Sequence, residues 1–281
     1  MKDHHKEYPV TTMCRLLGVS RSGFYAWLDR PISRRSERIA KLIGQIKDAH
    51  AQSRGTYGSP RITVELKARS VAVCRNTVAK YMRKAGIQSR IKRPFVPRTT
   101  DANHPHPVAR NLLDRNFAAA APNTKWTCDI TYLWTGQGWL YLAIVMDLHS
   151  RRIIGWSMKD HLKSDLAQEA LTMAIRQRRP QSSLLHHSDR GVQYACGDYQ
   201  NLLKEQGITA SMSRTGNCYD NAVTESFFGT LKTEHVHHQQ FQSRDQARSS
   251  VFEWIEVFYN RQRRHSSLGY LSPEAFEAQI N

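Results

Sequence analysis

The chain has 281 residues, enough for one large domain or for two to three small ones, and it carries 41 Lys and Arg against 24 Asp and Glu. The formal charge of +17 is concentrated in residues 1–122, which hold 24 basic and 8 acidic side chains, whereas residues 123–281 hold 17 and 16. The first part is therefore predicted to bind a polyanion. Nucleic acid is favoured over a membrane surface, because each neutralised phosphate releases counterions.

Membrane and targeting signals are not found. The longest apolar run, Trp139 to Met146, has eight residues, far fewer than the ~18 that a membrane span needs, and the first residues lack the character of a signal peptide. We therefore expect a cytoplasmic protein with no membrane partner. The cysteines form no C-x-x-C pair, so they predict neither a zinc site nor a disulfide framework: Cys14, Cys74, Cys128, Cys196 and Cys218.

Residues 11–28 carry the first signal for a DNA-binding unit. Apolar residues at helical spacing precede Gly18, which is expected to end a helix, and Ser20 then offers an N-cap to a second helix. Two short helices around a glycine turn are typical of a helix-turn-helix, and a plain helical hairpin is the alternative. We assign residues 1–50 to this helical, helix-turn-helix-like segment.

A second helix-turn-helix unit is predicted over residues 51–87. Pro60 begins a first helix, and a second helix over Cys74–Ala85 ends before Gly86. The outer side of this second helix is basic and polar, as a helix that reads the DNA major groove requires. A solvated cationic face is the alternative. The side chains on this outer face are Arg75, Asn76, Lys80, Arg83 and Lys84.

Residues 88–122 are predicted to form a basic, proline-rich linker. Positive charges at Arg90, Lys92, Arg93 and Arg98 are interleaved with prolines. Prolines favour an extended backbone and the charges favour phosphates, so we expect this segment to follow a DNA backbone.

From Thr124 onward the pattern changes to strands and helices that alternate. Three strands come first, and helices then alternate with two short strands. The predicted strands are Lys125–Trp134, Trp139–Leu148, Arg152–Met158, Leu184–Ser188 and Ile208–Met212, and the predicted helices are Ser164–Gln177, Asp198–Gln206 and Asp220–Lys232. This order predicts an α/β fold over residues 123–235: a ribonuclease-H-like core with a five-stranded mixed sheet and flanking helices. Residues 236–281 are expected to add a helix, Arg244–Tyr259, and a basic tail.

Three acidic residues lie at positions where a charged side chain suggests a functional site. Asp129 is in the middle of a strand whose apolar residues have the opposite parity, and a charge there is costly unless it is paired or binds metal. Asp189 directly follows a strand, at the edge where open α/β sheets place ligands. Glu225 lies 36 positions later in a helix, with Lys232 on the same face, where it can contact a DNA phosphate. The sequence therefore predicts a carboxylate site for divalent metal.

Three converging carboxylates on divalent metal are a means of cutting and joining phosphodiester bonds. We expect Asp129, Asp189 and Glu225 to be both catalytic residues and ligands of two Mg²⁺ ions, for which Mn²⁺ can substitute. Asp147, which also ends a strand, is a weaker candidate for a metal ligand.

The adjacent histidines His186 and His187 are a further candidate pair of metal ligands. Neighbouring residues of a strand point to opposite faces of a sheet. We therefore expect one histidine to be structural and the other to lie near the site.

Several segments together resemble one family. They are Tyr57-Gly58-Ser59-Pro60-Arg61-Ile62, Asp129-Ile130-Thr131-Tyr132, His187-Ser188-Asp189-Arg190-Gly191, Asp220-Asn221-Ala222 through Glu225-Ser226-Phe227-Phe228 to Lys232, and Tyr259-Asn260 through His265 to Ser272-Pro273. From about Tyr8 to Phe276 the chain resembles the second-reading-frame protein of bacterial insertion-sequence transposases of the insertion-sequence-three type, with a D,D-35-E integrase core. The core is also similar to retroviral integrases, whose N-terminal zinc-binding His and Cys pairs are missing here.

The resemblance implies Mg²⁺-dependent cleavage at the ends of an insertion sequence, followed by attack of the exposed 3′-hydroxyl on a phosphodiester. The implied partners are the terminal repeats and the target DNA, further copies of the chain on that DNA, and an upstream-frame protein that supplies a helix-turn-helix and a coiled coil. The implied location is the bacterial cytoplasm, at the nucleoid. The expected DNA contacts are Arg21, Arg61, Arg75, Asn76, Lys80, Lys84, Lys92, Arg93, Arg190, Lys232, Arg263 and Arg264.

Two other functions fit parts of the sequence. In the first, the basic arm and helical units belong to a sequence-specific DNA-binding regulator whose core is catalytically silent. In the second, the core is a ribonuclease that degrades RNA, which leaves the basic arm without a role. The three acids together with Lys232 favour the transposase over both.

Overall fold

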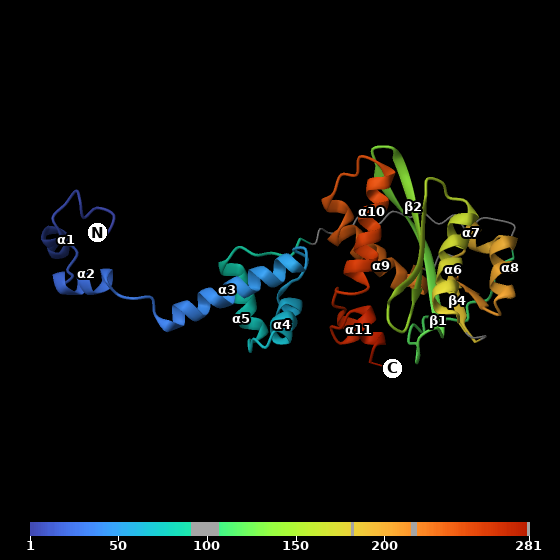
Figure 1. Cartoon of the computed structure of the whole chain (residues 1–281), viewed down its shortest axis with the longest axis horizontal. Coiled ribbons are helices and arrows are strands. Elements are labelled where there is room, and N and C mark those ends of the chain that lie inside the picture. The colour runs from blue at the N-terminus through green and yellow to red at the C-terminus, as the bar shows by residue number, and fades with distance from the viewer. Residues whose placement is uncertain (91–106, 181–182, 215–217, 280–281) are drawn as a thin grey trace.

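A computed structural model describes residues 1–90, 107–180, 183–214 and 218–279. Figure 1 shows three parts along the chain: a small helical pair at the N-terminus, a three-helix unit, and an α/β core that carries the remaining helices. The C-terminal helices lie between the three-helix unit and the sheet. No helix within the described part of the chain is long and apolar enough to cross a membrane.

The N-terminal pair consists of α1 (Val10–Leu16) and α2 (Arg21–Leu28), and these helices agree with the two predicted from the sequence. The Ser20 hydroxyl accepts a hydrogen bond from the Gly23 N–H at 3.0 Å, which is the expected N-cap. Gly18 ends the first helix with a φ of +64°, a conformation that glycine adopts without a steric cost. Figure 1 shows this pair apart from the rest of the chain.

The three-helix unit contains α3 (Arg34–Gln52), α4 (Ser59–Ala68) and α5 (Arg75–Lys84). The second and third of these agree with the predicted helix pair, but the first crosses the boundary predicted at residue 50. Ile46 and Ala49 of α3 pack in one apolar core with α4 and α5, so a division at residue 50 would cut through both the helix and its core. The buried members of that core are Ile46, Ala49, Tyr57, Ile62, Leu66, Val78 and Met82.

The α/β core is built on one mixed sheet of five strands, as the sequence predicts, and the strand order is β3-β2-β1-β4-β5. The first three strands form an antiparallel meander, and β4 and β5 add in parallel to its β1 side. Successive residues of β1 and β2 point to opposite faces, so hydrophobic residues of these strands contribute to the apolar cores on both sides of the sheet. The strands are β1 (Lys125–Thr135), β2 (Gly138–Asp147), β3 (Ile153–Lys159), β4 (Leu185–Ser188) and β5 (Thr209–Met212).

Helices cover both faces of this sheet. One apolar core joins the sheet to α6 (Ser164–Arg178), α7 (Val192–Ala195) and α8 (Gly197–Glu205). The core on the other face joins it to α9 (Ala222–Glu234) and α10 (Arg244–Glu253). These helices lie on opposite sides of the strands in Figure 1.

The last part of the chain departs from the predicted single helix over Arg244–Tyr259. The α-helix α10 ends at Glu253, and a π-helical turn, Trp254–Tyr259, continues it. This turn places the buried aromatic rings of Trp254, Phe258 and Tyr259 against α9 and the sheet, so tertiary packing decides the change of helix type. A short helix, α11 (Pro273–Glu277), follows.

The predicted linker 88–122 is wrong for its second half. Residues 107–122 lie against the core: Leu113 is buried, and the amides of Leu112 and Leu113 donate to the Ser211 hydroxyl on β5 at 2.9 and 3.2 Å. These contacts come from backbone amides and one apolar side chain, which charge and proline content do not reveal. Residues 91–106 lie outside the described residues, and so do Lys92 and Arg93.

Candidate active site

Two of the three acids are brought together by the register of neighbouring strands. β1 pairs in parallel with β4 from Lys125↔Leu185 to Thr127↔His187. Two residues further along the same register, Asp189 follows the end of β4 at the level of Asp129 on β1. The parallel ladder ends there, so β1 has an open edge beside the two carboxylates. The site therefore lies at a strand end of the kind where α/β sheets place ligands.

Glu225 reaches this edge from α9, and Asn221 holds the start of that helix against β1. The Thr127 hydroxyl donates to Asn221 Oδ1 at 2.9 Å, and Asn221 Nδ2 donates to the Cys128 carbonyl at 3.4 Å. Although Asn221 is at the N-cap position, its side chain makes no capping bond to α9. It joins the helix to the two residues that precede Asp129, which sets the distance between strand and helix at the site.

The charges of Asp189 and Glu225 act on the buried carboxylate of Asp129. Burial raises the pKa of Asp129 well above its ordinary value, and repulsion from Asp189 and Glu225 raises it further. The Ile130 amide and the ammonium of Lys232 act in the opposite direction. Burial also raises the pKa of Glu225. A cation bound between these groups would relieve that repulsion.

Backbone amides orient two of the carboxylates. The Ile130 N–H donates to Asp129 Oδ1, and the Gly191 N–H donates to Asp189 Oδ1, both at 2.8 Å. A Cβ atom at Gly191 would lie 3.0 Å from the same Asp189 oxygen, closer than ordinary van der Waals contact. Glycine at this position therefore leaves the Asp189 carboxylate free of steric pressure.

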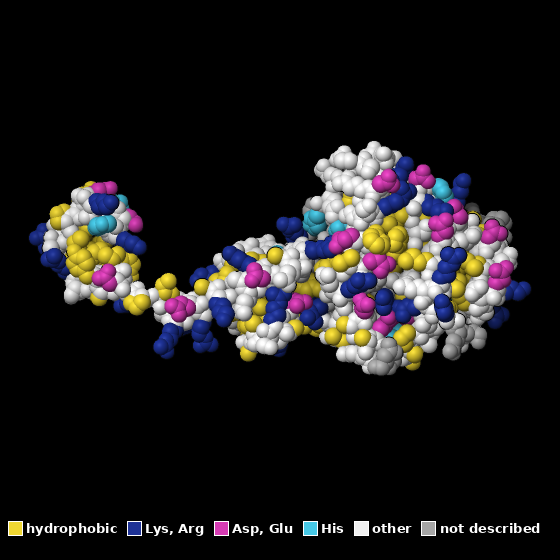
Figure 2. All heavy atoms as spheres, viewed as in Figure 1, with side chains coloured by type: hydrophobic (Ala, Val, Ile, Leu, Met, Phe, Trp, Pro, Cys, Tyr) yellow, Lys and Arg dark blue, Asp and Glu magenta, His cyan; other side chains and the backbone are white. Residues whose placement is uncertain are grey.

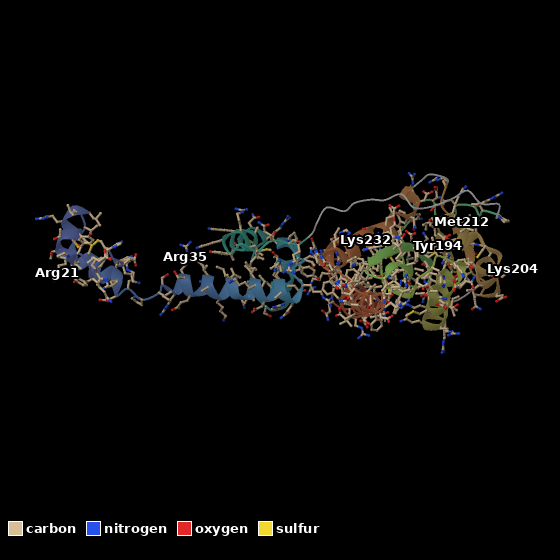
Figure 3. The ribbon with its side chains drawn as sticks, turned by 90° about the horizontal axis from the view of Figure 1, so that it is seen from above. Arg21, Arg35, Tyr194, Lys204, Met212 and Lys232 are labelled. Atoms are coloured by element: carbon tan, nitrogen blue, oxygen red, sulfur yellow. The ribbon has the colours of Figure 1, made fainter. Side chains whose placement is uncertain are left out.

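Lys232 lies seven residues after Glu225 on α9. Its ammonium is 5.0 Å from the centre of the Tyr132 ring on β1. Burial lowers the pKa of Lys232, and the nearby Asp129 charge counteracts that effect. Figure 3 labels Lys232 in the α/β core, far along the chain's long axis from Arg21 and Arg35. The predicted association of Lys232 with the acids is consistent with this placement.

The donor set suits a hard divalent cation, because all three side chains offer carboxylate oxygens. As the side chains stand, no three His, Cys, Asp or Glu residues in the described ranges are close enough together to hold an ion. Glu225 is exposed on α9, and its charge acts on Asp129. The chemistry of the three side chains, rather than their present spacing, fits a divalent metal.

A buried carboxylate beside the site, Asp220, has a role that the sequence does not reveal. Arg214 donates to it from its backbone amide and from its guanidinium, at 2.9–3.2 Å, and Arg115 and Asn111 donate to it as well. Burial alone would raise the pKa of Asp220, but these hydrogen bonds lower it to about 2. Asp220 therefore ties residues 107–122 to the loop that leads into α9. In the sequence, this role is indicated only by the position of Asp220 directly before Asn221.

The exposed face of α5 agrees with the predicted DNA-reading surface. Val78 and Met82 are buried, whereas Arg75, Asn76 and Lys80 face solvent, as does Lys84. Figure 2 shows Lys and Arg side chains along the three-helix unit. Arg21 is exposed on α2. In the core, Arg190 directly follows Asp189 and donates to the Ser213 carbonyl. DNA contact at these residues stays a prediction.

Three predicted DNA contacts, Arg61, Arg263 and Arg264, are corrected by the structure. Arg263 is buried and donates twice to Glu234, at 2.7 Å each. Arg61 lies 3.5 Å from the same carboxylate, and Arg264 donates to Glu65 at 2.6 Å. Arg61 and Arg264 join the three-helix unit to the C-terminal part of the core, and Arg263 pairs within that part. All three guanidinium groups are thus paired with carboxylates rather than free to form a phosphate-binding surface. Their carboxylate partners are distant in the sequence.

Asp147 and the two histidines are structural. Asp147 is buried and accepts backbone hydrogen bonds from Asn123 and His149, at 2.8 and 2.9 Å. Burial lowers the pKa of His186 to about 3 and that of His187 to about 4, so both rings are neutral at pH 7. His186 pairs with the Tyr199 hydroxyl, and His187 with two serines.

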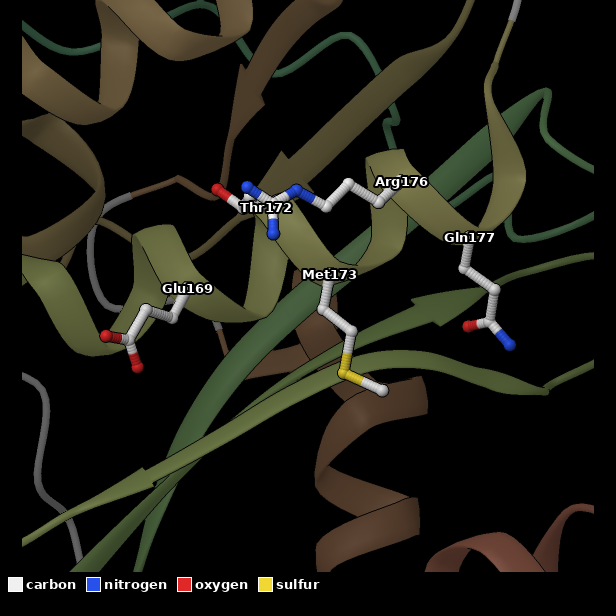
Figure 4. Close-up of a pocket in the computed structure, with 5 residues that line it drawn as sticks. All are labelled: Glu169, Thr172, Met173, Arg176 and Gln177. Atoms are coloured by element: carbon white, nitrogen blue, oxygen red, sulfur yellow. The ribbon is translucent and has the colours of Figure 1, made fainter.

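A shallow hollow of about 610 Å³ lies along α6, away from the three acids. Figure 4 shows its lining on one helix: Glu169, Thr172, Met173, Arg176 and Gln177. It contains no group of the carboxylate site, so it adds nothing to the chemistry of that site.

Matches to family models follow the same division of the chain. Two models described as integrase core domain match residues 119–218 and 206–273, and one described as an HTH-like domain matches residues 37–95. The fold and site thus define a protein with a ribonuclease-H-like integrase core preceded by a helix-turn-helix-like region, which confirms the predicted fold class. The HTH-like match begins within α3, in agreement with the packing of that helix on α4 and α5.

Relatives of nearly full length complete the identification. The chain is 45% identical over 279 residues to the transposase InsF for insertion sequence IS3A of Escherichia coli (strain K12), a match that covers 99% of this chain and 96% of that protein. It is 46% identical over 264 residues to the insertion element IS600 uncharacterized 31 kDa protein of Shigella sonnei, covering 94% and 97%. The chain belongs to the IS3 family of transposases, as its motifs predict.

Solved structures with lower similarity are also found. One is a simian T-cell lymphotropic virus intasome in complex with PP2A regulatory subunit B56 gamma, at 15% identity and a TM-score of 0.48, covering 83% of this chain and 74% of that chain. Another is the HTLV-2 integrase catalytic core domain in complex with magnesium, at 17% identity and a TM-score of 0.44, covering 56% and 98%.

Proposed function

We propose that the chain cleaves DNA at the ends of its insertion sequence and transfers the resulting strand to a new phosphodiester, with Asp129, Asp189 and Glu225 as metal ligands and catalytic residues. The observation that supports this proposal is that a strand, a strand end and a helix supply carboxylates to one edge of β1, where burial and then repulsion from Asp189 and Glu225 raise the pKa of Asp129. Carboxylates gathered in this way are stable in their charged form only with a cation.

Two Mg²⁺ ions held by these carboxylates would activate the attacking oxygen and stabilise the leaving oxygen. The chain's own groups do the rest. The amides of Ile130 and Gly191 keep the Asp129 and Asp189 carboxylates oriented. Lys232, at the same edge, is placed to bind a phosphate next to the one that is cut.

DNA is the partner that the helix-turn-helix-like region and the charge of residues 1–122 support. We infer that α5 reads the terminal repeat through Arg75, Asn76, Lys80 and Lys84. We further propose that several copies act together on DNA, and that an upstream-frame protein supplies a coiled coil and a further helix-turn-helix.

The test is strand cleavage of labelled DNA that carries the element's own ends, with Mg²⁺ and with EDTA. Wild type and Glu225→Gln are compared, each alone and each with the upstream-frame protein. Cleavage only by wild type with Mg²⁺ is the expected result. Tight binding without cleavage under both conditions would contradict the proposal and favour a DNA-binding regulator. Greater activity on an RNA–DNA hybrid than on element ends would favour a ribonuclease.

A further inference from the structure

An exposed group of aromatic rings lies on the β1–β2 hairpin, on the same strand as Asp129. Trp134 and Trp139 are 62% and 43% exposed, although tryptophan is highly buried on average. Their ring centres are 4.8 Å apart at 74°, and the Tyr132 ring follows at 5.0 Å from Trp139 and 84°. The three rings therefore form one contiguous aromatic surface that is open to solvent.

Lys232 links this aromatic surface to the candidate active site. The Lys232 ammonium lies over the Tyr132 ring at 5.0 Å and senses the charge of Asp129. Tyr132 and Trp134 follow Asp129 by three and five residues on β1, about 10 and 17 Å along the strand at ~3.3 Å per residue, and their side chains leave the opposite face of β1 from the carboxylate. Bases in one strand of B-DNA are ~3.4 Å apart, so the rings are within about three to five nucleotides of the carboxylates.

The hairpin that carries the rings is held rigidly from the side of α10. The Gly136 N–H donates to the Phe241 carbonyl at 2.8 Å, and Arg244 donates to the Trp139 carbonyl at 3.1 Å. A Cβ atom at Gly136 would lie 2.6 Å from the Gln242 carbonyl oxygen, so only glycine allows this close approach. These contacts fix the position of the hairpin backbone that carries the two indoles.

We propose that Tyr132, Trp134 and Trp139 form a stacking site for unpaired nucleobases of the DNA strand that passes the carboxylates. Exposed aromatic faces next to a cation are the recurrent means of binding unpaired DNA, because every base has a π-face and every nucleotide a phosphate. Cross-strand pairing of Trp134 with Trp139 would by itself stabilise the hairpin. It explains neither their exposure nor their continuity with Lys232. The proposal rests on the function proposed above.

The test measures binding rather than cleavage, so it is independent of the catalytic proposal. End-DNA with its last five nucleotides unpaired is compared with the same DNA fully paired, in EDTA, by fluorescence anisotropy. Variants are Trp134→Leu and Trp139→Leu, which keep an apolar side chain, and Trp134→Phe, which keeps a ring. Phe252→Leu is the matched control, because Phe252 is a similarly exposed aromatic residue on α10.

Wild type is expected to prefer unpaired ends, and each Trp→Leu variant to bind them about 5- to 150-fold more weakly while its affinity for paired DNA is unchanged. Trp134→Phe should keep most of the preference, and Phe252→Leu all of it. Equal losses on both DNAs, or no loss, would overturn the stacking site. A change in oligomeric state without a change in DNA preference would also overturn it, since the rings would then bind protein. If wild type cleaves element ends but these variants keep the preference for unpaired ends, the stacking site is refuted and the proposed cleavage function is not affected.

Discussion

Glu234 at the end of α9 provides the sharpest test of how the parts of this chain are joined. Its carboxylate accepts two hydrogen bonds from Arg263 at 2.7 Å each and lies 3.5 Å from the Arg61 guanidinium on α4. The side chains of Glu234 and Arg263 are only 3% and 4% exposed. We predict that Glu234→Gln destabilises the chain, because the buried guanidinium of Arg263 and the half-buried one of Arg61 lose their counter-charge.

The magnitude follows from the geometry. Removing one partner of a buried ion pair costs about 3–5 kcal/mol. Glutamine has nearly the volume of glutamate, so no cavity term is added, and its oxygen still accepts one of the two bonds. We therefore expect a loss near the lower limit, about 3 kcal/mol.

Urea unfolding followed by tryptophan fluorescence measures this loss, because Trp254 is buried against His235 and Tyr259 close to the pair. Asp245→Asn is the control, since it breaks the exposed pair with Arg248 and should cost at most about 1 kcal/mol. The double variant Glu234→Gln, Arg263→Met should be more stable than the single variant, because one unpaired buried charge is gone. A loss from Glu234→Gln no larger than that of the control, or a double variant that is less stable still, would refute the reasoning.

Three further predictions concern packing, pH and DNA affinity. Gly155→Ala should destabilise the core by about 1–3 kcal/mol, because its Cβ would lie 2.1 Å from the Ala170 carbonyl oxygen. Gly44→Ala should instead stabilise the chain by about 0.5–1 kcal/mol, because a Cβ at this position on α3 would meet open space. The midpoints of denaturant unfolding measure both changes. Asp220→Asn should destabilise the chain at pH 6, and the difference in stability from wild type should shrink as pH falls from about 4 to 2. The reason is that the pKa of Asp220 is lower in the folded chain, so its ionised carboxylate stabilises the fold above this range and that stabilisation is lost within it. A difference that is undiminished at pH 3 would contradict the ion-pair role. Removal of residues 1–90, which keeps the core-packed residues 107–122, should reduce the slope of log affinity for DNA against log salt by at least half, and an unchanged slope would place the main phosphate contacts in the core.

The sequence by itself determines the order of elements and the kind of site. The apolar run of β2, the caps at Ser20 and Gly18, and the basic face of α5 are local patterns, and the structure has each of them. Asp129 and Asp189 could be recognised because each lies at an unusual place in its own strand. Such signals depend on neighbours within a few residues, so they do not require knowledge of the fold.

Only the tertiary structure decides which charges are free and what holds the site. Arg61 and its partner Glu234 are 173 residues apart, and Arg264 and Glu65 are 199 apart. A basic residue in such a pair has the same local sequence as one that binds phosphate.

The same limit applies to Asn221, which is 94 residues from Thr127, and to residues 107–122, whose packing on β5 their composition does not reveal. Hydrogen bonds and ion pairs between distant segments depend on how the chain returns on itself. Local periodicity does not contain that information.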